Sequence, residues 1–342
     1  MCKMNLQRSL KFIITVIFLA VIPEISAKGI ENFSHRGCDT TLSAKDRKRF
    51  SGFEYSGYRP LRDKPVNVYY YIPTSGDIQT MPVLFVLSGA QRVGNGELNP
   101  WYRLAEEYGF IIINPQFTKE LYNENEYQFG NVAVAKKSTE LNKKKKWAYN
   151  IIEDLFDYYL KVTGSKVKGY YLFGHSAGGQ FVHRLVMMLP DARYIKAVAA
   201  NPSAWTMPLE DGLRDSSGAV YGWPYSVKDT PSGNRRVLKK VLSRRLYVQI
   251  GSNDIKTKSL DQSAGANAQG PRRYHRALKF YDVCTAVADS LGIECGFRLA
   301  VVDGTRHSTL QAVYGYPDPD VTKTEEADLG INSAFNLLFR RD

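Results

Sequence analysis

Cysteine and histidine are scarce in this sequence. Its 342 residues include four cysteines and five histidines, and no two cysteines have the C-x-x-C spacing. No cluster of these residues has metal-ligand spacing, so we expect neither a metal site nor a cofactor. Cys284 and Cys295 flank one short predicted turn. In an oxidising compartment we expect these two to pair, with Cys38 left over; the alternative is three unpaired thiols.

Acidic residues are fewer than basic ones. Asp and Glu number 34 against 46 Lys and Arg, a formal net charge of +12. The basic residues are scattered and accompany no RNA or DNA motif, so no nucleic-acid partner is expected. A composition of 44% hydrophobic and 12% aromatic residues argues against extensive disorder. The chain is long enough to bury a substantial core without disulfides or a structural metal.

Long hydrophobic runs are also missing. The run at residues 12–22 (FIITVIFLAVI) has 11 residues, whereas about 20 are needed to span a bilayer. It follows a basic start with Lys3, Arg8 and Lys11, and Ala27 stands at its exit. This pattern predicts a signal peptide over residues 1–27 and a secreted or periplasmic protein without a membrane anchor. The alternative is a buried N-terminal strand or an uncleaved anchor.

The rest of the chain alternates between strand-like and helix-like patterns. Strands are predicted at 66–72, 81–87, 110–114, 170–173, 195–200, 246–250 and 297–302, and helices at 99–108, 147–160, 177–189, 272–291 and 325–339. The alternation predicts an α/β fold: a mostly parallel central sheet with helices on both faces. Without repeats or long linkers, residues 28–342 are expected to form a single domain. Residues 203–235, rich in Gly, Pro, Ser and Trp, interrupt the alternation as an insertion.

One motif carries chemistry. Residues 174–178 read GHSAG, a G-x-S-x-G match between a predicted strand and a predicted helix. A sharp turn there points the hydroxyl of Ser176 out of the sheet, and the N–H of Ala177 stands at a helix N-terminus, where it can hold an oxyanion. The alternative is a glycine-rich strand–helix turn without catalytic function.

A serine nucleophile needs a basic partner, and three histidines follow it. His183 lies inside the helix after the serine, and His275 lies near the start of a predicted helix among arginines. His307 follows the strand at 297–302, at the carboxyl end where open parallel sheets form their sites. We therefore predict His307 as the base.

The acid is predicted in the same way. Asp254 comes just past the strand at 246–250 and precedes His307 by one helix and one strand, the serine–acid–histidine order. Asp303, four residues before the histidine, is the competitor, but it is better suited to capping the turn.

Two loops are expected to complete the site. The loop after Leu87 should supply the second oxyanion donor through the N–H of Ala90 or Gln91; a tight glycine turn without this role is the alternative. Trp205, Trp223 and Tyr225 in the insertion are candidates for binding substrate, although ordinary packing explains them nearly as well.

In the order VLFVLSGAQ, YLFGHSAGG, YVQIGSND and DGTRHS, these motifs resemble the α/β-hydrolase superfamily from about residue 66 to 340. Within it the chain looks like the secreted poly(3-hydroxybutyrate) depolymerase, feruloyl and acetyl-xylan esterase branch. The resemblance implies an α/β-hydrolase fold with the loop-rich insertion after the sixth strand. It also implies a Ser176–His307–Asp254 triad, an acyl-enzyme intermediate and an ester substrate, a polysaccharide ester or a polyester. The oxyanion loop reads SGAQ rather than HGGG.

Two other functions stay open at this point. One is a secreted serine peptidase on the same fold, although no propeller-sized domain accompanies it. The other is a non-catalytic binding protein that has kept the fold, against which the complete set of serine, histidine and acid argues.

Overall fold

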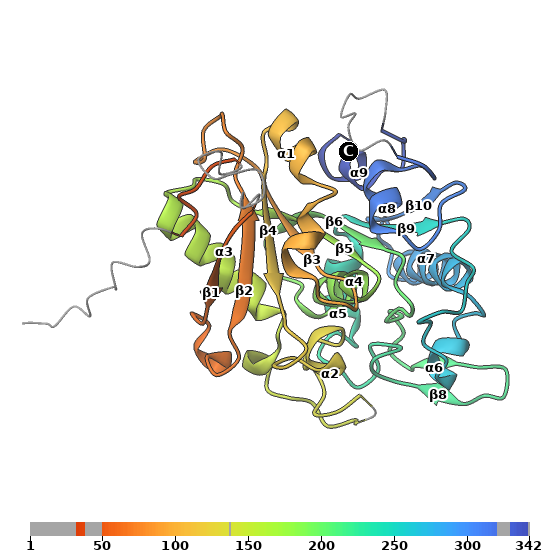
Figure 1. Cartoon of the computed structure of the whole chain (residues 1–342). Helices are drawn as coiled ribbons and strands as arrows, with labels where there is room; N and C mark the ends of the chain where they lie inside the picture. The colour runs from red at the N-terminus through yellow and green to blue at the C-terminus, as the bar shows by residue number, and fades with distance from the viewer. Residues whose placement is uncertain (1–31, 38–49, 137, 320–328, 341–342) are drawn as a thin grey trace, which may run out of the picture.

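The computed structural model describes residues 32–37, 50–136, 138–319 and 329–340 (Figure 1). The predicted signal peptide at residues 1–27 and Cys38 lie outside these residues. No helix of the described residues is long and apolar enough to cross a membrane. In the same residues, no group of three or more His, Cys, Asp or Glu side chains could hold a metal ion.

An eight-stranded mixed sheet forms the centre of the molecule, in the order β1-β2-β4-β3-β5-β6-β9-β10. β2 runs antiparallel to β1 and β4, and every other pair is parallel. The predicted mostly parallel α/β sheet is therefore confirmed. The strands are β1 Ser51–Tyr55, β2 Val66–Tyr71, β3 Val83–Leu87, β4 Ile111–Gln116, β5 Tyr170–His175, β6 Tyr194–Ala200, β9 Leu246–Gly251 and β10 Phe297–Val302.

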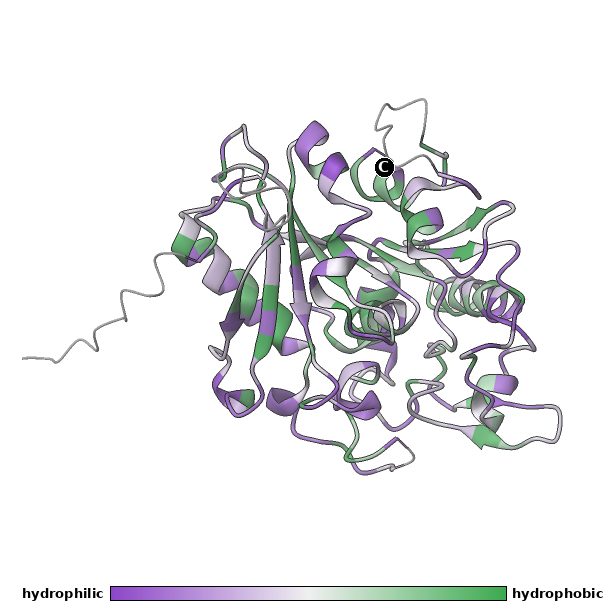
Figure 2. Ribbon diagram, in the orientation of Figure 1, coloured by the Kyte–Doolittle hydropathy of each residue, from purple (hydrophilic) through white to green (hydrophobic). Residues whose placement is uncertain are grey.

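Helices cover both faces of this sheet. One core, reached by Phe85 and Leu87 of β3, includes residues of α3 Asn150–Thr163, α4 Ala177–Met188, α5 Arg235–Leu242 and α7 Arg273–Ser290. The other, reached by Leu84 and Val86, includes residues of α1 Tyr102–Tyr108, α8 Thr309–Tyr314 and α9 Ala334–Phe339. Successive residues of a strand point to opposite faces, so β3 is apolar throughout because both faces are buried. Figure 2 shows hydrophobic colour on the central strands and hydrophilic colour on outer helices such as α1.

The insertion follows β6, as expected, and continues to α5. It contains the short hairpin β7 Leu213–Arg214 and β8 Val220–Tyr221. Two short helices, α2 Glu124–Tyr127 and α6 Ala264–Asn267, lie on the same side of the sheet as β8 (Figure 1). They lie at the end of the sheet where the parallel strands have their carboxyl termini.

Two predictions for the C-terminal third of the chain differ from the structure. Of the helix predicted at 325–339, residues 325–328 lie outside the described residues; from 329 on, the helix begins only at Ala334, where the Ser333 hydroxyl caps it by accepting the N–H of Asn336 at 3.1 Å. Cys284 and Cys295 are both buried free thiols, so the predicted disulfide is absent. Cys284 is part of the α7 core face, and Cys295 precedes β10.

Candidate active site

Ser176 occupies the turn between β5 and α4. Its φ of 58° and ψ of −115° lie in a region that L-residues rarely adopt, at a cost of about 1–3 kcal/mol. The neighbouring backbone holds this conformation. The Ser176 N–H donates to the carbonyl of Ala200 on β6 at 2.8 Å, and the Ser176 carbonyl accepts the N–H of Gln180 at 3.0 Å. The strained turn is therefore supported from both the sheet and the helix.

The flanking glycines let this turn pack closely. A Cβ on Gly178 would lie 2.1 Å from the carbonyl oxygen of Leu87, at the end of β3. A Cβ on Gly174 would lie 2.2 Å from the carbonyl oxygen of Gly178. Both contacts involve backbone that cannot move aside, so any larger residue at either position would push α4 away from the sheet.

Ser176, His307 and Asp254 lie in one hydrogen-bonded row. The Ser176 hydroxyl is 2.9 Å from Nε2 of His307, and Nδ1 of His307 is 2.7 Å from Oδ2 of Asp254. The carboxylate accepts only, so Nδ1 carries the proton and Nε2 is free to accept the serine proton. The three residues come from the carboxyl ends of β5, β9 and β10. The fold thus brings together side chains that are 131 and 53 positions apart in the sequence.

Asp254 has two further partners that the sequence did not reveal. The Asn201 amide donates to its Oδ2 at 2.6 Å, and Nη1 of Arg273 lies 3.4 Å from its Oδ1. The side chains of Asp254 and Arg273 are 0% and 1% exposed, so this is a buried ion pair. Arg273 also donates to the carbonyls of Lys256 and Lys258 at 3.1 and 2.9 Å, which fixes the loop after Asp254. Burial lowers the pKa of Arg273, while the charge of Asp254 acts to raise it.

His175 packs behind His307. The two rings have centroids 4.6 Å apart, and Nδ1 of His175 is 3.1 Å from the Thr309 hydroxyl. Burial lowers the pKa of His175 well below its usual value, and the nearby His307 and Arg273 lower it further. His175 is therefore a neutral ring that supports one side of the base.

The competing residues occupy other positions. His183 is buried, with Nδ1 bonded to the Gly179 carbonyl at 2.9 Å and Nε2 accepting the N–H of Thr206 at 3.1 Å. His275 is exposed on α7. Asp303 accepts the Ser252 hydroxyl at 3.0 Å instead of a histidine. None of the three competitors belongs to the Ser176 row.

The loop after β3 is held in place by its surroundings. The Gly89 N–H donates to Glu97 at 3.1 Å, and the Tyr127 hydroxyl donates to the carbonyl of Ser88 at 2.6 Å. Burial raises the pKa of Glu97, although the Gly89 N–H acts to lower it. Ala90 and Gln91 are exposed, and neither backbone N–H donates a hydrogen bond within the described part of the chain. Both amides are therefore still available as oxyanion donors.

The aromatic residues of the insertion divide into two groups. Trp205 was predicted as a candidate substrate contact, but it is 0% exposed and stacks on Phe280 with ring centroids 4.4 Å apart. It belongs to the core, so this prediction was wrong. Trp223 and Tyr225 instead line a cavity of about 510 Å³, together with Tyr221.

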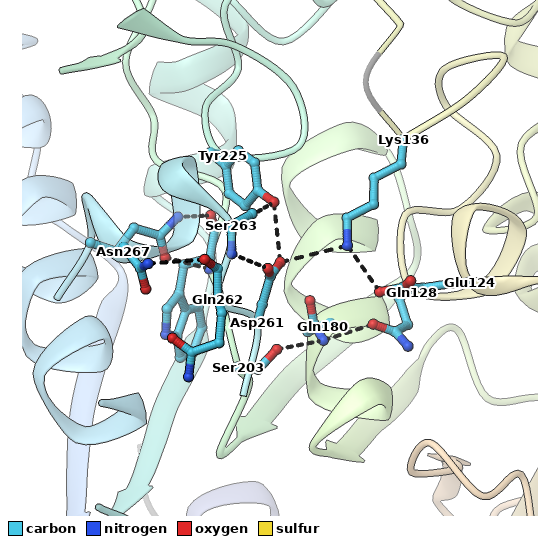
Figure 3. A network of polar contacts seen from close by, with 12 residues as sticks. Glu124, Gln128, Lys136, Gln180, Ser203, Tyr225, Asp261, Gln262, Ser263 and Asn267 are labelled. Atoms are coloured by element: carbon cyan, nitrogen blue, oxygen red, sulfur yellow. Dashed lines mark hydrogen bonds and ion pairs between the residues drawn. The ribbon is translucent and has the colours of Figure 1, made fainter. Parts of the chain in front are cut away.

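Buried arginines fasten the loops at this edge of the sheet. Arg276 donates to the carbonyls of Ser203 and Asp261, and Arg184 donates to the Thr206 hydroxyl and the Gln128 carbonyl. In Figure 3, Gln180 of α4 joins Gln128 and Ser203, while Lys136 reaches Glu124 and Asp261. These contacts tie the insertion and the loops around α2 and α6 to the helix that follows Ser176.

One family model and several solved structures resemble this chain. Residues 61–278 match the family model described as "Esterase: Putative esterase". Poly(aspartic acid) hydrolase-1 from Sphingomonas sp. KT-1 is 32% identical, with a TM-score of 0.68 over 76% of this chain and 94% of that one. LpqC, a poly(3-hydroxybutyrate) depolymerase from Bordetella parapertussis, is 27% identical, with a TM-score of 0.69 over 76% of this chain and 85% of that one. No curated protein matches the chain.

Proposed function

Since the chain belongs to the esterase family of α/β-hydrolases, we propose that it cleaves carboxylic esters of a polymer through an acyl-enzyme intermediate. The observation that carries the proposal is the row formed by Ser176, His307 and Asp254, with contacts of 2.9 and 2.7 Å. A serine whose hydroxyl faces the unprotonated nitrogen of an oriented imidazole is an activated nucleophile.

The chemistry takes two steps. Oγ of Ser176 attacks the ester carbonyl carbon while Nε2 of His307 takes the hydroxyl proton, and the same proton then passes to the oxygen of the departing alcohol. Water next attacks the acyl-enzyme, giving its proton to His307, and the acid leaves as the proton returns to Ser176. Asp254 orients the imidazole and stabilises its charged form. The N–H of Ala177 and that of Ala90 or Gln91 would hold the oxyanion, a contribution of about 10²–10³ in rate per donor.

We propose an ester-bearing polysaccharide or a polyester as substrate. The poly(3-hydroxybutyrate) depolymerase relative supports a polymeric substrate, and the cavity at the same edge of the sheet supports recognition beyond the scissile bond. Export is part of the same proposal, because a polymer too large to enter a cell must be met outside it. The proposal of export rests on the signal-peptide pattern of residues 1–27.

A second candidate is cleavage of the backbone of an acidic polymer. Two observations favour it: the relative that is 32% identical is a poly(aspartic acid) hydrolase, and this chain carries a net charge of +12. Positive charge raises the local concentration of an anionic substrate. An amide-cleaving serine hydrolase would use the same Ser176, His307 and Asp254.

A substrate panel separates these candidates. The purified protein should be assayed on p-nitrophenyl acetate, methyl ferulate, acetylated xylo-oligosaccharides, 3-hydroxybutyrate oligomers and poly(aspartic acid). We expect release of p-nitrophenol and cleavage of at least one of the natural ester classes. Cleavage of poly(aspartic acid) with no ester turned over would favour the second candidate. Failure on every substrate would contradict a hydrolytic function.

A further inference from the structure

The cavity of about 510 Å³ lies at the same edge of the sheet as Ser176. Two of its walls lie in segments that begin at Asn201 and at Asp254, two residues of the site. The insertion wall, which contains Tyr221 and Trp223, follows Asn201 after β6. The wall at Ser263–Gly265 follows Asp254 itself after β9. The third wall is the loop after α2. Two of the three walls are thus carried by loops that follow residues of the active site.

Two aromatic rings of the cavity, those of Tyr221 and Tyr225, are held in position by hydrogen bonds. The Gly222 carbonyl accepts the N–H groups of Tyr225 and Ser226, which turns the chain between the two rings. The Tyr221 hydroxyl donates to Asp215 at 2.6 Å. The Tyr225 hydroxyl donates to Asp261 at 3.1 Å and contacts the Ser263 hydroxyl at 2.5 Å (Figure 3). Rings fixed in advance lose little entropy when a ligand binds.

The charges around the cavity are balanced. Lys136 lies 3.2 Å from Glu124 and 3.7 Å from Asp261, and Lys228 lies 3.1 Å from Asp229. Each of the two cations therefore already faces a carboxylate. An anionic chain would have to displace one of these carboxylates or lie against it, so the cavity is unsuited to a polyanion.

The polar groups that remain select for hydroxyls. Ser138, Thr139 and Ser263 can donate or accept, whereas Asp229 is already paired with Lys228. A polyester offers carbonyl and ether oxygens but no donor along its chain, so it can use these hydroxyls only as donors. A sugar offers both donors and acceptors on its edges, and apolar C–H faces that fit aromatic walls.

From these observations we infer that the cavity is a subsite for an uncharged sugar residue of a polysaccharide. The inference deepens the proposed function, because it selects an ester-bearing polysaccharide from the candidate substrates.

A variant that fills the cavity tests this. A Cβ on Gly222 would meet only Lys228, at 3.8 Å, so a side chain can start there without a backbone clash. We expect Gly222→Trp to weaken binding of unesterified xylohexaose, measured by calorimetry, by at least about tenfold, the equivalent of one lost polar or stacking contact. Gly222→Ala, the matched control, should bind like the unmodified protein. Should Gly222→Trp fail to fold, Thr139→Trp fills the cavity from the opposite wall.

Turnover of p-nitrophenyl acetate gives an independent readout, since this small ester does not need the cavity. Its kcat/KM should be unchanged in the Gly222 variants. An unchanged Kd for xylohexaose in Gly222→Trp, or preferential binding of poly(aspartic acid) in the cavity, would overturn the inference. Sugar binding that depends on Gly222, in a protein without esterase activity, would support the subsite and contradict the proposed function alone.

Discussion

Ser176→Ala is expected to lower kcat for p-nitrophenyl acetate by about 10⁵–10⁶-fold, because the residual rate then comes only from binding and the oxyanion donors. The variant loses the oxygen that lies 2.9 Å from Nε2 of His307 and that would form the acyl-enzyme. Steady-state kinetics with the purified variant measure the change.

The matched control is Ser243→Ala, an exposed serine at the end of α5. Its kcat should stay within about twofold of the unmodified protein, as is usual for a surface substitution. Circular dichroism and the melting temperature should show that both variants are folded. If Ser176→Ala kept more than a tenth of the original kcat, Ser176 would not be the nucleophile.

Asp254→Asn is expected to lower kcat by about 10⁴-fold, because an amide can hold the imidazole in the wrong tautomer and does not stabilise its charge. Asp303→Asn is the matched control, since Asp303 bonds Ser252 and not His307. We expect it to retain nearly full activity. The opposite result, with Asp303 essential and Asp254 dispensable, would transfer the role of the acid to Asp303.

The same change should also reduce stability. Asp254→Asn leaves Arg273 charged and unpaired in a site where its side chain is 1% exposed, a defect that costs about 3–5 kcal/mol. Adding Arg273→Met removes the unpaired charge, so the double variant should recover part of the free energy of unfolding while its activity stays low. Recovery of activity together with stability would show that the loss came from misfolding rather than from the missing acid.

The sheet and the row of three residues could be predicted from the sequence for a physical reason. Strands buried on both faces, such as β3, are apolar throughout, and their carboxyl ends meet at one edge. Asp254 and His307 could be identified because each lies in the loop at the carboxyl end of a predicted strand, β9 or β10. The strand–Ser176–helix context located the third member in the same way.

Residues that act through tertiary contacts could not be predicted from the sequence. Arg273 looks like one of several arginines before a helix, and only the fold brings it to Asp254. Trp205 lies in the same insertion as Trp223 and Tyr225, yet Phe280, 75 positions later, buries it. The short strand β1 carries no distinctive hydrophobic pattern, and it is recognised by its pairing with β2.

Part of the positive charge has also acquired a structural explanation. Arg92, Arg184, Arg273 and Arg276 are buried, and their guanidinium groups bond backbone carbonyls of the loops around the site. A guanidinium has five donors and suits this purpose better than a lysine. These arginines therefore stabilise the loops and do not form an external basic face.

The central claim is that Ser176 is the nucleophile, and labelling with a fluorophosphonate tests it most directly. The reagent should form one phosphonyl–serine bond as fluoride departs, and mass spectrometry should locate the adduct on Ser176. Ester hydrolysis should fall in proportion to labelling, and Ser176→Ala should take up no label. Loss of activity with the adduct on another residue, and Ser176 unmodified, would contradict the account.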